Sequence, residues 1–321
     1  MRAAALTSRN TDGHVHLEKV ATVQLPGPSL GLNQALIRVN ASSVNPVDWK
    51  APFEFNDPSR SYPFILLQDF MGEVVATGPG CSGPRPGDRV WGMADGAAAD
   101  FLAADCGSFD LAPRGAKAEE AAALPLVALT GLQGFRWAGG AGFLRGKTVL
   151  VLGGSGGTGH TGLQLAKAFG AGRVITTCSE GNFDFVKAHG ADEAIDYHEH
   201  NWYDVLAPGS VDMIYDCVCE DGTGEYAYRV LRDGGRFATL LPGALASPFT
   251  AARRPSVQQT FYFLDQRGAP DLAMLRSLVE DGRLRAHVSR TYPLDGVRAA
   301  LNESLGGHTV GKVAISVAGW P

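Results

Sequence analysis

A single stretch, residues 148–179, constrains the fold more than any other part of the sequence. Residues 149–152 form an uninterrupted apolar run, which is typical of a parallel strand buried on both faces. A glycine-rich turn follows, and then apolar residues at helical spacing. Residues 174–177 are β-branched and apolar, which predicts a second strand. The order strand, turn, helix and strand indicates the start of a doubly wound parallel sheet.

Within the turn, Gly154, Gly156 and Gly159 have the spacing G-x-G-x-x-G. Between a buried strand and a helix, this spacing is typical of dinucleotide binding. One glycine permits the tight turn, one lets the backbone approach a pyrophosphate, and one lets the helix pack on the strand. N–H groups at the helix start then face the anion. A glycine-rich turn without a ligand is the alternative. The residues predicted to bind the cofactor here are Gly154, Ser155, Gly156, Gly157 and Thr158.

The chain of 321 residues is long enough for about two domains. Residues 1–124 contain short apolar strands broken by turn residues, so we expect a β-rich domain. Residues 148–264 alternate strand and helix, which predicts an α/β domain with a doubly wound parallel sheet. Residues 268–321 lack the glycine pattern, and we expect them to return to the first domain. The predicted domains are therefore 1–124 with 268–321, and 125–267.

Charge and composition exclude several classes of partner. The formal net charge of −5 gives no indication of a nucleic-acid or anionic-membrane partner. No apolar run reaches the length of about 18 residues that a membrane helix needs. The N-terminus becomes polar too early for a secretory signal, so we expect a cytoplasmic location. The five cysteines are odd in number and scattered, so a disulfide framework is not expected.

Strand ends supply further candidates, because a doubly wound sheet binds its ligand at the carboxyl ends of its strands. Beyond the glycine turn, these predicted cofactor contacts are Ser179, Cys217, Val218 and Leu241. Cys217 and Cys219 form the only close cysteine pair. No second ligand pair at zinc spacing accompanies them, so we predict no metal site.

Several short motifs occur in one order along the chain: residues 43–48, 69–75, 87–90, 123–125 with 129–131, the glycine turn, 190–192 with 196–197, and 310–313. Together they resemble the zinc-independent quinone oxidoreductase branch of the medium-chain dehydrogenase/reductase superfamily, over nearly the whole chain. The resemblance implies a GroES-like catalytic domain built from both chain ends and a Rossmann domain between them. It also implies NAD(P)H-dependent reduction of quinones or α,β-unsaturated carbonyls, by homodimers or homotetramers.

The chain departs from the zinc-dependent members of that superfamily. Those members carry a Cys and His pair near the position of Asn45, together with a four-Cys lobe, and neither is present in this sequence. Alcohol oxidation is disfavoured without that Lewis acid, and hydride delivery to an electrophilic acceptor is favoured. Met71 stands where many relatives have alanine, which we expect to reshape the substrate site.

The end of the second strand bears on the choice of cofactor. NAD-specific folds usually carry Asp or Glu there, bound to the ribose 2′-hydroxyl. Here Ser179 follows the strand, and it leaves room for a 2′-phosphate. Asn182 and Tyr197 are further neutral donors. The carboxylate of Glu180 would be unfavourable if it faced a 2′-phosphate. A structural role, in which Ser179 caps the following helix, is the alternative. We favour NADPH over NADH.

On the acceptor side, hydride addition to an enone places negative charge on the carbonyl oxygen, where a hydrogen-bond donor is needed. Asn45 is the candidate donor, because the resemblance implies a position in the cleft; an Asn-Pro turn is the alternative. Trp49 and Tyr62 are predicted to line the cleft with their rings, which carry a polar N–H and O–H group respectively. Core packing is the alternative for both. No general acid is convincing, so water is the expected proton source.

The remaining predicted cofactor contacts, Asn45 among them, lie outside the glycine turn. The resemblance implies that Thr130 lies beside the nicotinamide and that Lys312 lies near the cleft. Helix packing and a solvated surface lysine are the respective alternatives. Phe261 and Phe263 lie at the predicted end of the last strand, where backbone groups would bind the nicotinamide carboxamide.

Three functions of different classes remain open. The leading hypothesis is an NADPH-dependent quinone or enone reductase. The second is an enoyl-thioester reductase, for which Arg253 and Arg254 are a candidate basic entrance. The third is a low-turnover NADPH-binding sensor or structural protein.

Overall fold

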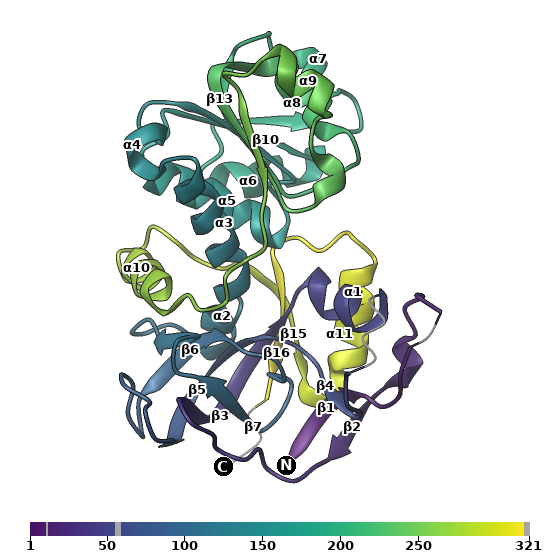
Figure 1. The fold of residues 1–321 in the computed structure, drawn as a ribbon, viewed down its shortest axis with the longest axis vertical. Coiled ribbons are helices and arrows are strands. Elements are labelled where there is room, and N and C mark those ends of the chain that lie inside the picture. Colours follow the sequence, from purple (N-terminus) through teal and green to yellow (C-terminus); the bar gives the residue numbers. More distant parts are fainter. Residues whose placement is uncertain (11, 55–58, 318–321) are drawn as a thin grey trace. The chain divides into compact units, whose positions relative to one another are not determined.

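The computed structural model describes residues 1–10, 12–54 and 59–317. The chain divides into two compact units (Figure 1). Unit 1 consists of Met1–Leu129 and Asp265–Pro321, and unit 2 consists of Thr130–Leu264. The division at residue 129 falls inside helix α3 (Pro125–Trp137), a few residues beyond the predicted boundary. None of the helices in the described part of the chain is long and apolar enough to cross a membrane.

Unit 2 contains a six-stranded parallel sheet in the order β11-β10-β9-β12-β13-β14. The order reverses between the adjacent strands β9 and β12, and open parallel sheets bind ligands at such a reversal, beyond the carboxyl ends of the strands. The strands are β9 (Thr148–Leu152), β10 (Arg173–Cys178), β11 (Glu193–Asp196), β12 (Val211–Asp216), β13 (Leu231–Thr239) and β14 (Gln258–Phe261). The helices are α4 (Gly140–Leu144), α5 (Gly157–Ala168), α6 (Phe183–Ala188), α7 (Trp202–Val205), α8 (Thr223–Val230) and α9 (Pro248–Arg253).

Two strands of unit 2 differ from their predicted bounds. Residues 233–235 lie inside β13, where the β12–β13 register shifts. Strand β14 ends at Phe261, so Phe263 lies beyond it and is 85% exposed. Leu241 likewise follows the end of β13, at the start of the 3₁₀ turn η3 (Pro242–Ala244).

Unit 1 contains a three-stranded sheet, β2-β1-β4, and a seven-stranded sheet, β15-β16-β3-β5-β6-β8 with β7 also paired to β3. Both chain ends contribute to the larger sheet, because β16 pairs antiparallel with β3. The strands are β1 (Arg2–Leu6), β2 (Val20–Gln24), β3 (Gln34–Val44), β4 (Phe64–Ile65), β5 (Asp69–Thr77), β6 (Arg89–Met93), β7 (Phe101–Asp105), β8 (Phe109–Leu111), β15 (Val288–Pro293) and β16 (Lys312–Ser316). The helices are α1 (Pro46–Glu54), α2 (Ala118–Ala122), α10 (Ala269–Glu280) and α11 (Val297–Leu305).

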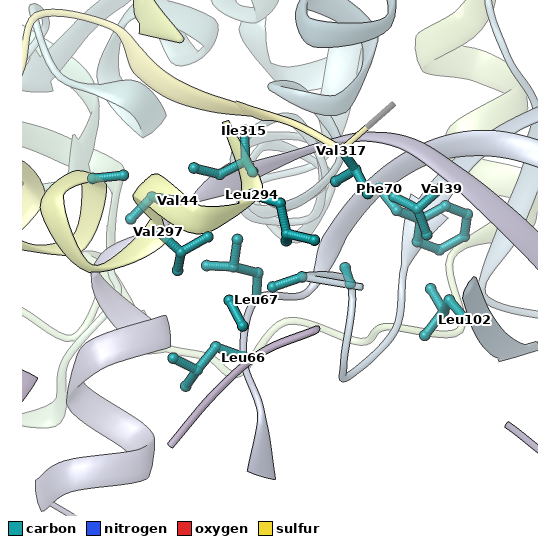
Figure 2. Packing of buried hydrophobic residues seen from close by; sticks show 14 of the residues in the cluster. Val39, Val44, Leu66, Leu67, Phe70, Leu102, Leu294, Val297, Ile315 and Val317 are labelled. Atoms are coloured by element: carbon teal, nitrogen blue, oxygen red, sulfur yellow. The ribbon is translucent and has the colours of Figure 1, made fainter. Parts of the chain in front are cut away.

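The hydrophobic core of unit 1 joins residues that are far apart in the sequence. Figure 2 shows Val44 of β3 among Leu294, Val297 and Ile315 from the C-terminal part of the chain. Each of these side chains is buried. Burial of one aliphatic side chain stabilises a fold by roughly 1.5–3 kcal/mol. This packing fixes the register of β3 against its neighbours, on which the polar cluster described below depends.

One disulfide corrects the expectation drawn from the cysteine count. Cys81 and Cys106 are bonded, with their Cα atoms 5.7 Å apart and a sequence separation of 25. Asn33 links the two segments, because its N–H donates to the Pro79 carbonyl at 2.8 Å and its carbonyl accepts from the Cys106 N–H at 2.9 Å. Spacing alone gave no signal for this bridge, since the contact depends on the sheet.

Candidate active site and cofactor site

The glycine turn between β9 and α5 has the geometry of a phosphate-binding turn. Gly153 has a φ of +77°, which favours glycine. A Cβ at Gly154 would lie 2.0 Å from Oγ1 of Thr176, and a Cβ at Gly159 would lie 2.0 Å from the Gly153 carbonyl oxygen. No side chain caps the start of α5 at Gly156. The N–H groups of that first turn therefore suit a pyrophosphate.

The turn meets the ends of the two strands that flank β9. The N–H of Gly153 donates to Oγ1 of Thr177 at 3.0 Å. On the other side, a Cβ at Gly153 would lie 2.9 Å from Cγ2 of Val218, and the Cys217 N–H donates to the Leu152 carbonyl at 3.3 Å. The structure thus gathers the glycine turn and residues 217–218, as expected for one crevice.

Ser179 follows β10 and is oriented by a neighbouring amide. Its side chain does not cap the following turn, η2 (Glu180–Asn182), so the helix-cap alternative is wrong. Its Oγ instead accepts a hydrogen bond from Nδ2 of Asn182 at 2.9 Å. The hydroxyl hydrogen of Ser179 is then available to a ligand. Tyr197 is exposed, and its ring packs against His198 with centroids 4.2 Å apart.

A carboxylate that the sequence interpretation did not weigh lies close to Ser179. Asp196 ends β11 and pairs with Cys178 in the sheet. Its Oδ2 accepts the N–H of Glu180 at 3.2 Å. A 2′-phosphate near Ser179 would therefore have two acidic neighbours, Glu180 and Asp196. The signal was available in the sequence, because Asp196 occupies the end of the strand adjacent to β10.

The cysteines at the end of β12 remain thiols. Burial is the main cause that raises the pKa of Cys217 and of Cys219. The carboxylate of Asp216 raises both further. Metal ligation requires the thiolate. Across residues 1–10, 12–54 and 59–317, no group of three or more His, Cys, Asp or Glu side chains is arranged to hold a metal ion.

In unit 1, sheet register builds a buried polar cluster from three distant segments. Ser43 of β3 pairs with Asp69, the first residue of β5. On the other side of β3, the end of the strand pairs with the start of β16, which begins at Lys312. Asn45 directly follows β3 and contacts both neighbours. We call Ser43, Asn45, Asp48, Asp69 and Lys312 the polar cluster.

Asp69 is the main hydrogen-bond acceptor of the polar cluster. Its Oδ2 accepts from Oγ of Ser43 and from Nδ2 of Asn45, both at 2.7 Å. Its Oδ1 accepts from the backbone N–H of Leu126 at 2.8 Å. Nζ of Lys312 lies 3.5 Å from Oδ2. A buried carboxylate is stable in this position because four donors face it.

Lys312 is the buried cation of the polar cluster, so the alternative of a solvated surface lysine is wrong. Its side chain is 3% exposed. Its Nζ donates to the Val44 carbonyl at 2.8 Å and to Oδ1 of Asn45. Burial lowers the pKa of Lys312, while the charge of Asp69 opposes this shift. The amide of Asn45 is therefore oriented at both ends, its oxygen by Lys312 and its nitrogen by Asp69.

Asp48 is the second buried carboxyl group of the polar cluster. Its Oδ2 accepts the N–H of Asn45 at 2.7 Å, and only 4% of the residue is exposed. Burial is the main cause that raises the pKa of Asp48 to about 8, and the charge of Asp69 adds to the shift. Lys312 acts in the opposite direction. With one carboxylate and one ammonium already paired, a neutral Asp48 balances the charge of the cluster.

Asp48 also lines a cavity of about 550 Å³ whose lining residues all belong to unit 1. Its face of α1 carries residues at helical spacing, Val47, Asp48, Ala51 and Pro52. The other lining residues are 60–61, 63–68 and 95–96. Its lining combines apolar side chains with the charged residues Asp48, Arg60 and Asp95, and its size is typical of small-molecule sites.

Trp49 and Tyr62 pack on the core of unit 1. The indole N–H of Trp49 donates to Oγ of Ser304 on α11 at 3.1 Å. Their neighbours Asp48, Ser61 and Pro63 line the cavity, whereas Trp49 and Tyr62 are not among its lining residues in the described chain. Core packing therefore accounts for the contacts of both, and their part in an acceptor site stays a prediction.

Three other predicted contacts lie in unit 2. Thr130 is buried on α3, and its carbonyl accepts from the hydroxyl of Tyr262 at 2.7 Å. The rings of Phe261 and Phe263 lie edge to face, 4.9 Å apart. The expected basic entrance is not a free pair, because Arg254 forms an ion pair with Asp233 at 2.8 Å. These placements leave the cofactor contacts of Thr130, Phe261 and Phe263 as predictions.

Comparisons with known proteins agree with this architecture. Residues 31–128 match the family described as alcohol dehydrogenase GroES-like domain, and residues 189–315 match the family described as zinc-binding dehydrogenase. The chain is 33% identical to 2-methylene-furan-3-one reductase of Solanum lycopersicum over 90% of this chain and 73% of that protein. It is 32% identical to a chloroplast envelope quinone oxidoreductase homolog of Arabidopsis thaliana, over 91% and 92% of the two chains.

A solved structure resembles the whole chain. It is the quinone oxidoreductase from Coxiella burnetii, with 27% identity, a TM-score of 0.86, and coverage of 99% of this chain and 100% of that chain. The chain belongs to the quinone oxidoreductase branch of the medium-chain dehydrogenase/reductase superfamily. The predicted combination of a Rossmann sheet and a GroES-like domain is confirmed. Members of this superfamily use a nicotinamide cofactor, for which the glycine turn of unit 2 is suited.

Two further relatives carry NADPH in their descriptions. An NADPH-dependent alkenal/one oxidoreductase of Arabidopsis thaliana is 29% identical over 90% of this chain and 73% of that protein. A mycobacterial protein solved as a complex with NADPH is 27% identical, with a TM-score of 0.82 over 99% of this chain and all of that chain. Both similarities extend over most of this chain.

Proposed function

We propose that this protein is an NADPH-dependent reductase of quinones and of the C=C bond of α,β-unsaturated carbonyls. The observation that carries the proposal is that one chain contains both features: a glycine turn without a side-chain cap in unit 2, and a buried polar cluster with a Lys312–Asp69 ion pair in unit 1. The first suits a dinucleotide, and the second offers donors to an acceptor. The names of the relatives, which include quinone oxidoreductases and an alkenal/one oxidoreductase, support the same substrate classes.

NADPH is preferred over NADH in this proposal because Ser179 and Asn182 follow β10. Their hydroxyl and amide groups are neutral donors that suit a 2′-phosphate, and the strand itself ends without an acid. Glu180 and Asp196 oppose the preference, so we expect it to be modest. The two relatives described with NADPH support this choice.

The proposed chemistry needs no zinc. When bound, the cofactor supplies a hydride, and the protein supplies position and polarisation. A Lys312 ammonium already occupies the centre of the polar cluster, beside Asn45 and Asp69, and such a donor set does not suit a divalent metal. We propose hydrogen bonding as the means of polarising the acceptor.

Asn45 is the proposed donor to the acceptor oxygen. One hydrogen of Nδ2 is given to Asp69, and among the described residues the second has no partner. Lys312, bound to Oδ1, draws electrons from the amide and keeps it from rotating. Trp49 and Tyr62 are partly buried and pack against the hydrophobic core of unit 1. Oligomeric state and cellular location remain the predictions made from sequence: a homodimer or homotetramer, in the cytoplasm.

One assay tests the function. Oxidation of NADPH is followed by its absorbance with 9,10-phenanthrenequinone, a simple enone and crotonyl-CoA in turn. We expect turnover with the first two and little with the third, since Arg254, half of the expected basic entrance, is paired with Asp233. Turnover of crotonyl-CoA alone would favour an enoyl-thioester reductase. Tight NADPH binding with no turnover of any acceptor would favour a binding protein.

A further inference from the structure

Reduction of an enone requires a proton as well as a hydride. Hydride addition to the β-carbon leaves an enolate, and the saturated ketone forms only when that enolate is protonated. The sequence indicated no general acid and left water as the source. Unit 1 supplies a candidate, because Asp48 is buried beside Asn45 and lines the 550 Å³ cavity.

The hydrogen bonds of Asp48 determine where its proton resides. Oδ2 accepts the N–H of Asn45 at 2.7 Å, so that oxygen acts as an acceptor. Among the described residues, Oδ1 makes no hydrogen bond. In a neutral carboxyl group with this arrangement, the proton belongs on the oxygen that accepts nothing. Asp48 can therefore donate from Oδ1 while Oδ2 stays anchored to the backbone.

Burial and several charged groups around Asp48 act on its pKa. Asp69 of β5 and Asp95, in the loop after β6, place negative charge near it, and Lys312 of β16 places positive charge. Burial is the main cause that raises the pKa of Asp48 to about 8; the charges of Asp69 and Asp95 act in the same direction, and the Asn45 N–H and Lys312 act in the opposite one. Arg60 lines the same cavity, and its guanidinium donates a hydrogen bond to the Pro52 carbonyl at 3.2 Å. A general acid works best with a pKa near the operating pH.

The cavity suits a neutral organic acceptor. Pro52, Phe64 and Leu66 provide apolar walls near the acid. The guanidinium of Arg60 lies 4.8 Å from the Phe64 ring centroid, which keeps a cation at the same wall. An enone offers a hydrocarbon body to these walls and a carbonyl to the polar groups.

We propose that Asp48 is the general acid of the reaction and gives its proton to the reduced acceptor in this cavity. The proposal rests on the proposed function. A new C–H bond forms at the β-carbon from the hydride and its electron pair, and the π pair of the C=C bond moves to give the enolate. The O–H bond of Asp48 then breaks, and its proton bonds to the α-carbon. Water returns a proton to the carboxylate. The acceptor gains two electrons and two hydrogens, with NADPH as the reductant.

Quinones provide an internal comparison. Hydride transfer to a quinone gives a hydroquinone anion, which is a much weaker base than an enolate. That anion leaves and takes a proton from water without help. Loss of the acid at Asp48 should therefore slow enone reduction far more than quinone reduction. General structural damage would slow both alike.

The test uses Asp48→Asn, which keeps an oxygen to accept the Asn45 N–H. We expect kcat for an enone to fall about 10²-fold or more, and kcat for 9,10-phenanthrenequinone to fall less than about tenfold. Asp100→Asn is the matched control, because Asp100 is another buried carboxylate of unit 1 and accepts the Arg2 N–H at 2.6 Å. We expect the control to leave the ratio of the two activities unchanged.

The wild-type enzyme gives a second test that needs no variant. Enone turnover should decline as pH rises through about 8, the pKa of Asp48. Quinone turnover should show no decline over the same pH range. Equal losses on both acceptors in Asp48→Asn, or an enone profile flat through this range, would overturn the proposal. If wild-type protein reduces neither acceptor, the proposed function fails with it; if it reduces both and Asp48→Asn is unchanged, this inference alone fails.

Discussion

The glycine turn of unit 2 and the polar cluster of unit 1 differ in the groups that they offer to a ligand. The turn offers backbone N–H groups with no side-chain cap, and it requires glycine because an added Cβ would lie as close as 2.0 Å to a neighbouring atom. The cluster is made of side chains, is buried, and balances one ammonium against Asp69 and a protonated Asp48. One region depends on the absence of side chains, and the other on their charge.

This difference assigns the two halves of the reaction. A backbone site binds any pyrophosphate of the right shape, so it sets cofactor affinity without selecting an acceptor. In the proposed reaction, the buried polar side chains provide a fixed field and a proton source, so we expect them to affect the rate and the choice of acceptor. Variants in unit 2 should change cofactor binding, and variants in the polar cluster should change stability or turnover.

The largest expected effect is on stability, from Lys312→Met. Removal of the ammonium leaves Asp69 buried without its cation, which costs about 3–5 kcal/mol. Urea unfolding measures the loss. Lys167→Met is the control, since its pair with Asp192 is partly exposed, and it should cost less than about 1 kcal/mol. Equal losses would mean that the polar cluster is no more than a surface ion pair.

The next effect concerns the backbone site. In Gly159→Ala the new Cβ would meet the Gly153 carbonyl, so the turn must shift. The shift weakens the hydrogen bonds from the turn to the pyrophosphate, and we expect NADPH affinity to fall by about tenfold or more in isothermal titration, since one hydrogen bond to a charged group is worth about 1.5–3 kcal/mol. Gly142→Ala, in α4, has open space at its Cβ and should bind as wild type does. Unchanged affinity in Gly159→Ala would remove the turn from the cofactor site.

Asn45→Ala should separate turnover from binding. Loss of one donor to the acceptor oxygen lowers kcat by roughly 10- to 10²-fold, while the Kd for NADPH stays nearly constant because the turn lies in unit 2. Asn10→Ala removes another buried amide of unit 1, bonded to the His14 and Phe53 carbonyls, and should leave kcat close to wild type. An unchanged kcat in Asn45→Ala would exclude that residue from the mechanism.

The smallest expected effect is a change of cofactor. Ser179→Asp places a carboxylate where NAD-specific folds have one, and it should shift the ratio of NADH to NADPH affinity about tenfold or more toward NADH. Glu180→Gln should shift the ratio slightly the other way, because one negative charge near the 2′-phosphate is removed. Titration of both cofactors into both variants measures the ratios. No shift in Ser179→Asp would place the 2′-position elsewhere.

The sequence predicted most of unit 2 because its signals are local. The apolar run of β9, the glycine spacing and the residues after β10 all lie within about thirty residues, and each signal follows from backbone geometry. Strand ends were less certain. β14 stops at Phe261 because pairing with β13 ends there, and no residue type marks that point.

The polar cluster was not predictable in the same way. Asn45 was found through the motif that contains it, but its partner Lys312 lies 267 residues away, and only the register of β16 on β3 joins them. The raised pKa of Asp48 depends on its burial. The sequence does not reveal that burial, because an aspartate in a short helix is normally expected to be exposed. The bond between Cys81 and Cys106 escaped prediction for the same reason.

The identity of the product from an enone tests the proposed reaction most directly. NADPH and a simple enone are incubated with the wild-type enzyme, and the product is analysed by NMR. We expect the saturated ketone, with one new hydrogen from the cofactor at the β-carbon and one from solvent at the α-carbon. An allylic alcohol, formed by hydride addition to the carbonyl carbon, would contradict the proposed reaction.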